Sequence, residues 1–541
     1  MDHNQHIAEL APLLEGVGIK QLILCPGSRN APLIQLFTRN HSFSCHSIVD
    51  ERSAGYVALG MARQLYEPVG IVTTSGTAVL NLAPAVAEAR YQNLPLFIFT
   101  ADRSPEDIAQ FNNQLIDQFE PFQRNVKGFY ELPPQAGDKK ELMEILSQVE
   151  NLAYAALAAP RGPVHFNVPL NEPLYENLPD PFIYLAGSGS VSEPEGENSP
   201  DSGSLSGNSK ILFLAGMGGG QEEMRTLLEE LTGSMQAVVV AENIANMPSD
   251  RFIANPELLI AAADEQEQSD LVPDFVVSFG GQVVSKQLKL FLKSHEHRLL
   301  QLKADPLPEL RNMVNTAGIG TGESTNSYLQ AWKNLEKRLI IKSLHFIENA
   351  GFSNLTAVHR IFSSLPGDAV LHLGNSASIR YSQLLPLRKD LMYYSNRGTS
   401  GIDGCVSTAV GAAMVSDRLH VLVVGDLSFV YDSNALWNNK FPDNLKIIVL
   451  NDGGGGVFRL IEGPGRMDFF EEYSVTHHPV SLELIAQAYG RRAQRAGDMN
   501  NLEEKLANLF LPDPGISILE VDTSGSKNSS IFRDFLTHNR K

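Results

Sequence analysis

The chain has 541 residues, of which 43% are hydrophobic and 19% are charged, and its formal net charge is −19 at pH 7. This length predicts roughly three or four domains, and the acidic balance argues against a nucleic-acid-binding surface. Three cysteines without metal-like spacing are typical of a reducing compartment rather than of a disulfide framework. Because the N-terminus lacks a basic-then-apolar leader and no run of about 18 apolar residues occurs, we expect a cytoplasmic protein without membrane insertion.

Short apolar runs alternate with helical-period segments along the chain. Runs bounded by Gly, Asp or Ser are typical of parallel strands buried on both faces. The clearest runs are residues 21–25, 70–74, 96–100, 211–215, 237–241, 275–279, 370–373, 420–424 and 446–450. The alternation predicts an α/β fold of doubly wound parallel sheets.

One segment interrupts this alternation. Residues 187–209 are rich in Gly, Ser, Pro and Glu and offer almost nothing to bury, so they predict an exposed linker. A second, less obvious break lies among polar helical residues near 333–352. We expect three domains at residues 1–182, 210–345 and 346–541, with a flexible linker at 183–209.

The first and last thirds of the chain echo each other in their spacing. Gly55 and Gly76 are 21 residues apart, as are Gly404 and Gly425; Gly76 and Asp102 are 26 residues apart, as are Gly425 and Asn451. In each case a small-residue helix precedes one strand and a second strand follows. The spacing predicts two diverged copies of one α/β unit.

A strand followed by a glycine turn and a helix is expected at residues 25–30, Cys-Pro-Gly-Ser-Arg-Asn. Ser28 and Arg29 at a helix N-terminus are typical of an anion site. Further basic residues stand at comparable strand ends: Arg103, Lys286, Arg380 and Arg397. Each alone is more often part of a surface ion pair, but the carboxyl edge of a parallel sheet is where α/β proteins bind ligands.

Two further motifs have competing interpretations. Glu51 opens a helix, where an acid is favoured by the helix dipole alone. The glycines at 216–220 follow a strand, but the acidic residue that a dinucleotide site needs about 20 residues on is represented only by Glu242, slightly late. A tight strand–helix turn is the better interpretation of these glycines.

Asp426 and Asp452 each follow an apolar run, and Asp452 leads directly into four glycines, 453–456. Two neighbouring strands would bring both carboxylates to one sheet edge, with backbone amides that a ligand can approach closely. Hard oxygen donors of this kind suit a magnesium-bound diphosphate, with a carbonyl near Gly454 as a further ligand. Either aspartate alone would more often cap a turn.

Two nearby motifs have simpler interpretations. Asp432 is expected to N-cap the helix through residues 435–437. The pair His477-His478 lacks the third ligand of a zinc site.

The pattern of Gly-Asp, then Asn-Asp and glycine, resembles the thiamine diphosphate signature. Longer motifs at 25–29, 49–55, 100–103, 395–404 and 425–428 resemble, in this order, the thiamine diphosphate-dependent 2-succinyl-5-enolpyruvyl-6-hydroxy-3-cyclohexene-1-carboxylate synthases of menaquinone biosynthesis. The resemblance spans almost the whole chain. It implies a pyrimidine-binding domain (1–182), a middle domain (210–345) and a diphosphate- and metal-binding domain (346–541), with each cofactor between two subunits of a homodimer or homotetramer.

The resemblance also implies a transferase reaction. 2-Oxoglutarate would be decarboxylated, and the succinyl carbanion equivalent would add to isochorismate in a Stetter-type 1,4-addition, with thiamine diphosphate and Mg²⁺ (or Mn²⁺) as cofactors. Glu51 would hydrogen-bond the aminopyrimidine ring, and burial would raise its pKa so that it shares a proton with the ring. Both substrates carry two carboxylates, so the site should be rich in cations.

Site residues follow from the matching motifs. Arg380 and Arg397 would hold the succinyl carboxylate, whereas isochorismate would face Ser28, Arg29, Arg103, Asn113, Gln114 and Lys286. Metal ligands would be Asp426, Asp452 and Gly454. Other cofactor contacts would come from Ser376, Ile402, Gly425, Leu427, Ser428, Gly455 and Val457, with Ile402 as the apolar wedge beneath the cofactor, and from the pocket-lining Phe458 and Ile461.

The chain departs from the family pattern at two positions. Asp452 stands where an Asn is usual, which adds a negative charge beside a polyanionic diphosphate and predicts a stronger dependence on metal concentration. Gln287 stands where many relatives have an Arg. The leading alternative is another thiamine diphosphate enzyme, an acetolactate synthase-like or 2-oxoacid decarboxylase protein; a non-catalytic protein of the same fold and a dinucleotide-dependent oxidoreductase fit less well.

Overall fold

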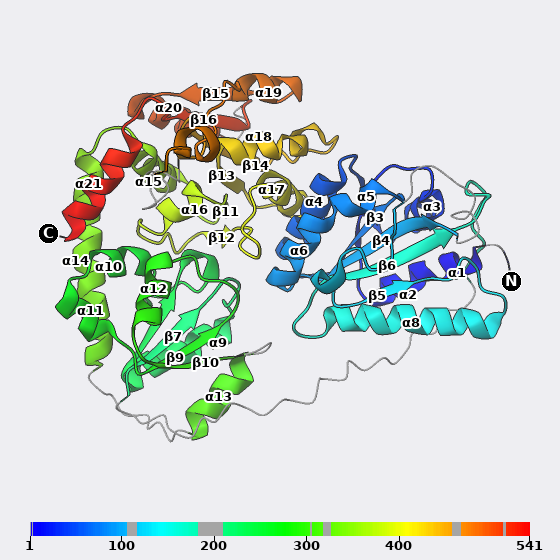
Figure 1. The fold of residues 1–541 in the computed structure, drawn as a ribbon, viewed down its shortest axis with the longest axis horizontal. Helices are drawn as coiled ribbons and strands as arrows, with labels where there is room; N and C mark the ends of the chain where they lie inside the picture. The colour runs from blue at the N-terminus through cyan, green and yellow to red at the C-terminus, as the bar shows by residue number, and fades with distance from the viewer. Residues whose placement is uncertain are drawn as a thin grey trace. The chain divides into compact units, whose positions relative to one another are not determined.

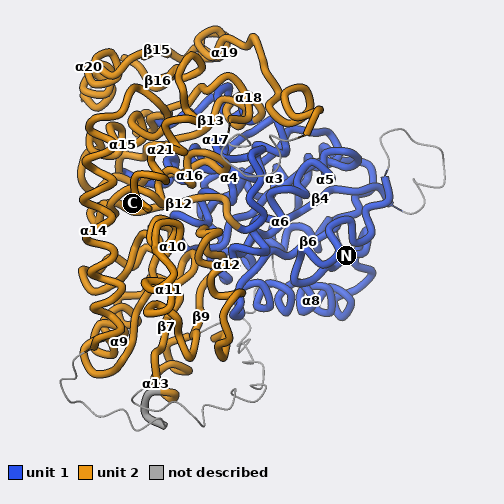
Figure 2. Tube along the Cα trace, turned by 60° about the vertical axis from the view of Figure 1, so that its left-hand side comes forward, with its two compact units in different colours: residues 1–195, 398–417, 432–442 blue, residues 196–397, 418–431, 443–541 orange. Residues whose placement is uncertain are grey.

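The computed structural model describes residue 2 and residues 4–104, 116–181, 209–302, 306–316, 326–456, 467–511 and 515–540. The chain forms two compact units (Figure 2). The first unit comprises residues 1–195, 398–417 and 432–442, and the second comprises residues 196–397, 418–431 and 443–541. Most of the expected linker, 183–209, lies outside the described residues.

The first unit holds a six-stranded parallel sheet in the order β2-β1-β3-β4-β6-β5. Its strands are β1 (Gln21–Leu24), β2 (Ser44–Ser47), β3 (Val69–Thr73), β4 (Leu96–Arg103), β5 (Phe129–Glu131) and β6 (Val164–Leu170). Its helices are α1 (Gln5–Ala8), α2 (Leu10–Gly16), α3 (Ala31–Arg39), α4 (Glu51–Leu65), α5 (Thr77–Asn81), α6 (Ala83–Gln92), η1 (Gln123–Asn125), α8 (Lys139–Leu157), α17 (Cys405–Met414) and the 3₁₀ turn η3 (Ser433–Trp437).

Alternation along the central strands gives this sheet two apolar faces. Leu22, Leu24, Phe97 and Phe99 join the core formed with α2, α3 and α8, and α4 and α6 lie on the opposite face (Figure 1). The strands are therefore buried on both sides, as the continuous apolar runs predict.

The second unit holds two parallel sheets. One has the order β10-β9-β7-β8, from β7 (Ile211–Ala215), β8 (Ala237–Ala241), β9 (Phe275–Phe279) and β10 (Arg298–Gln301). The other has the order β12-β11-β13-β14-β16-β15, from β11 (Val370–Leu373), β12 (Met392–Tyr394), β13 (His420–Gly425), β14 (Leu445–Asn451), β15 (Ala493–Ala496) and β16 (Ile518–Asp522).

Helices separate these strands (Figure 1). Those of the second unit are α9 (Glu222–Ser234), η2 (Asn243–Ala245), α10 (Pro256–Ala262), α11 (Glu265–Leu271), α12 (Lys286–Ser294), α13 (Pro306–Thr316), α14 (Ser327–Asn349), α15 (Asn354–Ser364), α16 (Ala377–Ser382), α18 (Asp426–Tyr431), η6 (Phe470–Ser474), α19 (Leu482–Ala488), α20 (Met499–Leu509) and α21 (Asn528–Arg540). The domain boundary expected between residues 345 and 346 falls within α14, whose buried residues join one core with both sheets.

The two six-stranded sheets have the same strand order, with β11–β16 standing where β1–β6 stand in the first sheet. This agreement confirms the expected α/β class and supports the predicted duplication. Within the described ranges, no helix combines the length and apolar character needed to cross a bilayer.

Candidate active site

The acid pair lies at the carboxyl edge of the last sheet. β13 and β14 are paired in parallel with Gly425 opposite Leu450, so Asp426 and Asp452 emerge just beyond neighbouring strand ends. Asp426 is only 3% exposed, and its carboxylate accepts hydrogen bonds from the backbone N–H of Leu427 (2.7 Å) and of Gly454 (2.9 Å).

Asp452 belongs to the same turn. Its Oδ1 accepts from the N–H of Gly456 (3.3 Å), and its Oδ2 accepts from the side-chain amide of Asn354 (3.2 Å). Gly454 adopts φ 107°, and a Cβ there would overlap the carbonyl of Thr476. Glycine is therefore required at this position. The same turn donates to Asp426 through Gly454 and to Asp452 through Gly456.

A diphosphate and a divalent cation fit this edge. A Cβ added at Gly425 would meet no heavy atom within 4 Å, so packing does not demand this glycine and open space lies beside it. Ser428 is buried in the first turn of α18. Among the described residues, no three His, Cys, Asp or Glu side chains gather as a metal site. A cation held by two carboxylates would thus take its remaining oxygens from the backbone and from the bound phosphate.

Structure adds a residue that sequence reasoning set aside. The Nε2 of His478, from the pair dismissed as a zinc site, lies 3.3 Å from Asp426 Oδ2. The ring therefore contacts the first of the expected metal ligands. No local pattern signals this contact, because 52 residues separate the two positions.

Three basic side chains, Arg380, Arg397 and Lys289, lie near one another in the same unit. Arg397 donates to Asn375 Oδ1 (3.1 Å), and Ser376, with φ 76°, precedes α16, which carries the exposed Arg380. Lys289 on α12 has a lowered pKa, first because of partial burial and then because the charges of Arg397 and Arg380 act on it. Both predicted arginines therefore lie within electrostatic range of one lysine, which the sequence analysis missed although it lies three residues after Lys286.

The N-terminus of α12 is fixed by acids. Glu242 accepts from the N–H groups of Val284 (2.5 Å) and Ser285 (2.6 Å), and burial raises its pKa to about 7. Glu257 accepts from the N–H of Gln287 (2.9 Å). Glu242 thus has a structural role at the start of α12. The Gly216 and Gly220 backbones also leave no room for a Cβ, which confirms the tight-turn interpretation of residues 216–220.

Glu51 opens α4 in the first unit. Asp50 caps this helix by accepting from the N–H groups of Arg52 (2.9 Å) and Ser53 (3.2 Å). Burial raises the pKa of Glu51, and the charge of Asp50 adds to the shift. The direction agrees with the expectation for a carboxyl that shares a proton with a ligand. The charge of Glu51 contributes to the raised pKa of Cys25, which follows β1, so these two segments lie near each other.

Arg29 and Arg103 both lie beside Leu170, the last residue of β6. Arg29 is buried, and its guanidinium donates to the carbonyl of Leu170 (3.0 Å) and lies 3.6 Å from Glu172. Arg103, the last residue of β4, is paired in register with Leu170. Ser28 is exposed in the turn before α3, which begins only at Ala31. The predicted anion-binding side chains therefore precede the helix instead of forming its first turn.

Asp432 stands at the expected N-cap position, but its side chain does not cap the helix. The following helix is a 3₁₀ turn, and Asp432 makes no side-chain hydrogen bond to it. The carboxylate is instead fully buried and accepts from the N–H and hydroxyl of Ser407, at 2.6 Å each. Burial raises its pKa to about 7. A propensity rule for helix starts could not anticipate this partner, 25 residues away.

Several candidates remain outside the described residues: Asn113, Gln114, Val457, Phe458 and Ile461.

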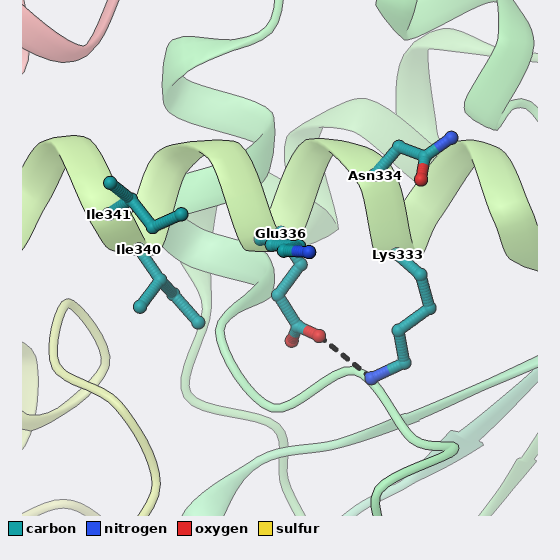
Figure 3. Close-up of a pocket in the computed structure, with 6 residues that line it drawn as sticks. Lys333, Asn334, Glu336, Ile340 and Ile341 are labelled. Atoms are coloured by element: carbon teal, nitrogen blue, oxygen red, sulfur yellow. Dashed lines mark hydrogen bonds and ion pairs between the residues drawn. The ribbon is translucent and has the colours of Figure 1, made fainter.

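A surface hollow of about 510 Å³ lies on α14, lined by Lys333, Asn334, Glu336, Lys337, Ile340 and Ile341 (Figure 3). Lys333 and Glu336 form an ion pair of 2.8 Å there and bind the backbone of Phe252 and Ala254. The hollow includes none of the candidate residues, and its charged groups anchor the helix.

Comparison with known proteins identifies the family. Residues 7–121 match the model described as "Thiamine pyrophosphate enzyme, N-terminal TPP binding domain", and residues 374–521 match "Thiamine pyrophosphate enzyme, C-terminal TPP binding domain". A 2-succinyl-5-enolpyruvyl-6-hydroxy-3-cyclohexene-1-carboxylate synthase of Desulfotalea psychrophila is 37% identical over 97% of this chain and 100% of its own length. The chain belongs to this synthase family.

Synthases of the same description from other bacteria are similar over comparable lengths. The one from Cytophaga hutchinsonii is 33% identical over 98% of both chains, and the one from Flavobacterium johnsoniae is 34% identical over 96% of both. The family assignment confirms the resemblance found in the motifs. The chain is thus a thiamine diphosphate-type enzyme with both cofactor-binding domains.

Proposed function

We propose that this protein catalyses the thiamine diphosphate- and Mg²⁺-dependent (or Mn²⁺-dependent) decarboxylation of 2-oxoglutarate. The succinyl group would then add to isochorismate, giving 2-succinyl-5-enolpyruvyl-6-hydroxy-3-cyclohexene-1-carboxylate and CO₂ in menaquinone biosynthesis. The observation that carries the proposal is full-length similarity, 37% over 97% of the chain, to a synthase named for that product.

The acid pair, Asp426 and Asp452, supports a binding site for the cation and the diphosphate. Asp426, Asp452 and the carbonyl of Gly454 would bind the cation, and Gly425, Leu427, Ser428 and Gly455 would face the diphosphate. Ser376, Ile402, Val457 and Phe458 would contact the rest of the cofactor. When bound, thiamine diphosphate would supply the nucleophilic carbon and the electron sink that decarboxylation of a 2-oxoacid requires.

Glu51 would hold a proton against the aminopyrimidine ring. Its raised pKa supports this role, because burial makes the carboxyl hold a proton more readily, and a protonated carboxyl can donate a hydrogen bond. Arg29 and Arg103 would orient isochorismate together with Ser28, Asn113, Gln114 and Lys286, and Ile461 would line the pocket.

Arg380 and Arg397 would bind the distal carboxylate of 2-oxoglutarate. The lowered pKa of Lys289 supports a shared electropositive region, because it records the charges of both arginines. Each charge-assisted hydrogen bond to a carboxylate contributes about 1.5–3 kcal/mol. A pyruvate-using relative would not need this many cations.

We further propose a cytoplasmic homodimer or homotetramer in which subunits share active sites, with a pyrimidine-binding domain at 1–182, a flexible linker at 183–209, a middle domain at 210–345 and a diphosphate-binding domain at 346–541. Light scattering after size-exclusion chromatography tests the assembly, and a monomer that retains full activity would refute shared sites.

Incubation of the purified protein with thiamine diphosphate, Mg²⁺, 2-oxoglutarate and isochorismate tests the function. We expect CO₂ release together with the cyclohexene carboxylate product, identified by mass spectrometry. Release of CO₂ without the adduct would instead favour a 2-oxoacid decarboxylase or an acetolactate synthase-like enzyme. Pyruvate in place of 2-oxoglutarate serves as the control substrate.

A further inference from the structure

A fully buried carboxylate on α6 holds one end of the loop at residues 398–404. Glu88 is 0% exposed. Its Oε1 accepts from the N–H of Gly398 (2.7 Å), and its Oε2 accepts from the N–H (2.6 Å) and the hydroxyl (2.6 Å) of Thr399. The amide of Gln92 donates a fourth hydrogen bond of 2.5 Å. Burying a carboxylate is costly unless such donors surround it, so its position and that of the loop are coupled.

The other end of the same loop is held by α4. The hydroxyl of Tyr56, a residue only 2% exposed, donates to Asp403 Oδ2 (3.1 Å). A Cβ at Gly404 would overlap the ring of Tyr56, so the backbone passes directly against the aromatic face. Both contacts lie within the first unit. The loop is therefore attached at two points to helices that precede it by more than 300 residues.

The helix that follows the loop, α17, packs against α4 (Figures 1 and 2). A Cβ at Gly60 would overlap the carbonyl of Thr408, and one at Gly411 would overlap the carbonyl of Val57. The backbones of α4 and α17 thus approach directly, as only glycine permits. A shift of α17 relative to α4 would have to break this contact, so the loop leads into a helix that is fixed against α4.

The held loop carries one group of the proposed function. Ile402 lies within it, immediately before Asp403. We propose that Glu88 and Tyr56 are positioning residues, which fix the loop at 398–404 so that Ile402 stands in one geometry beneath the bound cofactor. The inference rests on the proposed function, because it gives Ile402 its role toward thiamine diphosphate.

Conservative variants test the two attachment points separately. Glu88→Gln keeps the size of the side chain but replaces one acceptor oxygen with a donor, and Tyr56→Phe removes only the hydroxyl. Thr399→Val removes the loop hydroxyl, whereas Thr399→Ser retains it and should behave as the wild type. Matched controls are Glu144→Gln, at an exposed position of α8, and Tyr66→Phe, at a residue that is 58% exposed.

Two measurements report on positioning without turnover. Backbone hydrogen exchange of the peptide covering 398–404, in protein without cofactor, should be faster in Glu88→Gln, Tyr56→Phe and Thr399→Val than in the controls. Deuterium exchange at C2 of added thiamine diphosphate with Mg²⁺, read by proton NMR after acid quench, should slow about ten- to hundredfold, because small misplacements of catalytic groups have such effects.

The outcomes separate this inference from the proposed function. Unchanged loop exchange and unchanged C2 exchange in both Glu88→Gln and Tyr56→Phe would overturn the positioning role. Wild-type protein that fails to accelerate C2 exchange would overturn the proposed function, and the loop measurement would still decide the attachment. If Glu88→Gln does not fold, Tyr56→Phe and the Thr399 pair decide in its place.

Discussion

Replacing Asp452 with Asn tests what the unusual second acid does. Asn354 donates its amide to Asp452 Oδ2 (3.2 Å), while its own oxygen accepts from the hydroxyl of Thr523 (2.7 Å). The orientation of Asn354 is therefore fixed, and the single oxygen of an Asn at 452 must face it. The new amide would then face the N–H of Gly456, which loses its acceptor.

Two magnitudes follow from this geometry. Loss of the Gly456 hydrogen bond should lower the free energy of unfolding by about 0.5–1.5 kcal/mol. Two unit charges about 4 Å apart interact by about 1 kcal/mol in water and about 4 kcal/mol at an effective dielectric constant of about 20. Because Asp452 is half-buried and salt screens its charge, we take about 1.4 kcal/mol for its repulsion of a bound diphosphate, which corresponds to about tenfold in affinity.

Isothermal titration of thiamine diphosphate at limiting and at saturating Mg²⁺ measures this effect. At limiting Mg²⁺ we expect Asp452→Asn to bind the cofactor about tenfold more tightly than the wild type, because the wild type needs the cation to offset the repulsion. At saturating Mg²⁺ the two should converge. The matched control is Asp443→Asn, the same charge change just before β14, at the opposite end of the strand. Severalfold weaker binding of Asp452→Asn at both concentrations would refute the reasoning.

Three further substitutions have definite expected outcomes. Glu51→Gln should abolish most C2 proton exchange of added thiamine diphosphate while urea unfolding stays unchanged, and near-normal turnover would remove Glu51 from its role. Lys289→Ala should raise the KM for 2-oxoglutarate about tenfold relative to Lys293→Ala on the same helix, since it contributes to the cationic region; equal KM values would contradict this. Asp432 has a pKa of about 7 in the fold, above the unfolded value of about 3.9, so the folded state binds the extra proton and stability falls as pH rises from about 4 to 7. Urea unfolding at pH 5 and pH 8 measures the fall in the free energy of unfolding. This fall should be smaller in Asp432→Asn than in the wild type, and what remains should be due to Glu242. An equally large fall in both proteins would contradict the role of Asp432.

Strands were predictable where burial on both faces produces an apolar run. The runs at 211–215, 237–241, 275–279 and 370–373 coincide with β7, β8, β9 and β11 at both ends. β4 continues three residues past its expected end, to Arg103, because the ladder with β6 extends to Leu170. β2 has the sequence Ser-Cys-His-Ser and lies at a sheet edge, where no apolar run is required, so its pattern carries no such signal.

The candidate site was predictable where chemistry is concentrated at strand ends. Asp426 and Asp452 follow adjacent parallel strands, and the sequence alone indicates that they converge. The contacts of His478 with Asp426, of Ser407 with Asp432 and of Glu88 with residues 398–399 depend on tertiary packing between distant segments. Such partners have no fixed spacing, so periodicity and propensity rules cannot locate them.

The repeated strand order explains how the proposed chemistry is divided. In the first sheet, the edge at β1, β4 and β6 carries Arg29 and Arg103, and the helix after β2 begins with Glu51. In the last sheet, the equivalent edge at β13 and β14 carries the acids and the glycine turn. An acid pair suits a cation and a diphosphate, whereas a lone acid with a raised pKa suits proton exchange with a ring nitrogen. Two copies with one topology thus present different side chains at equivalent sheet edges, which is what the proposed division between proton exchange and diphosphate binding requires.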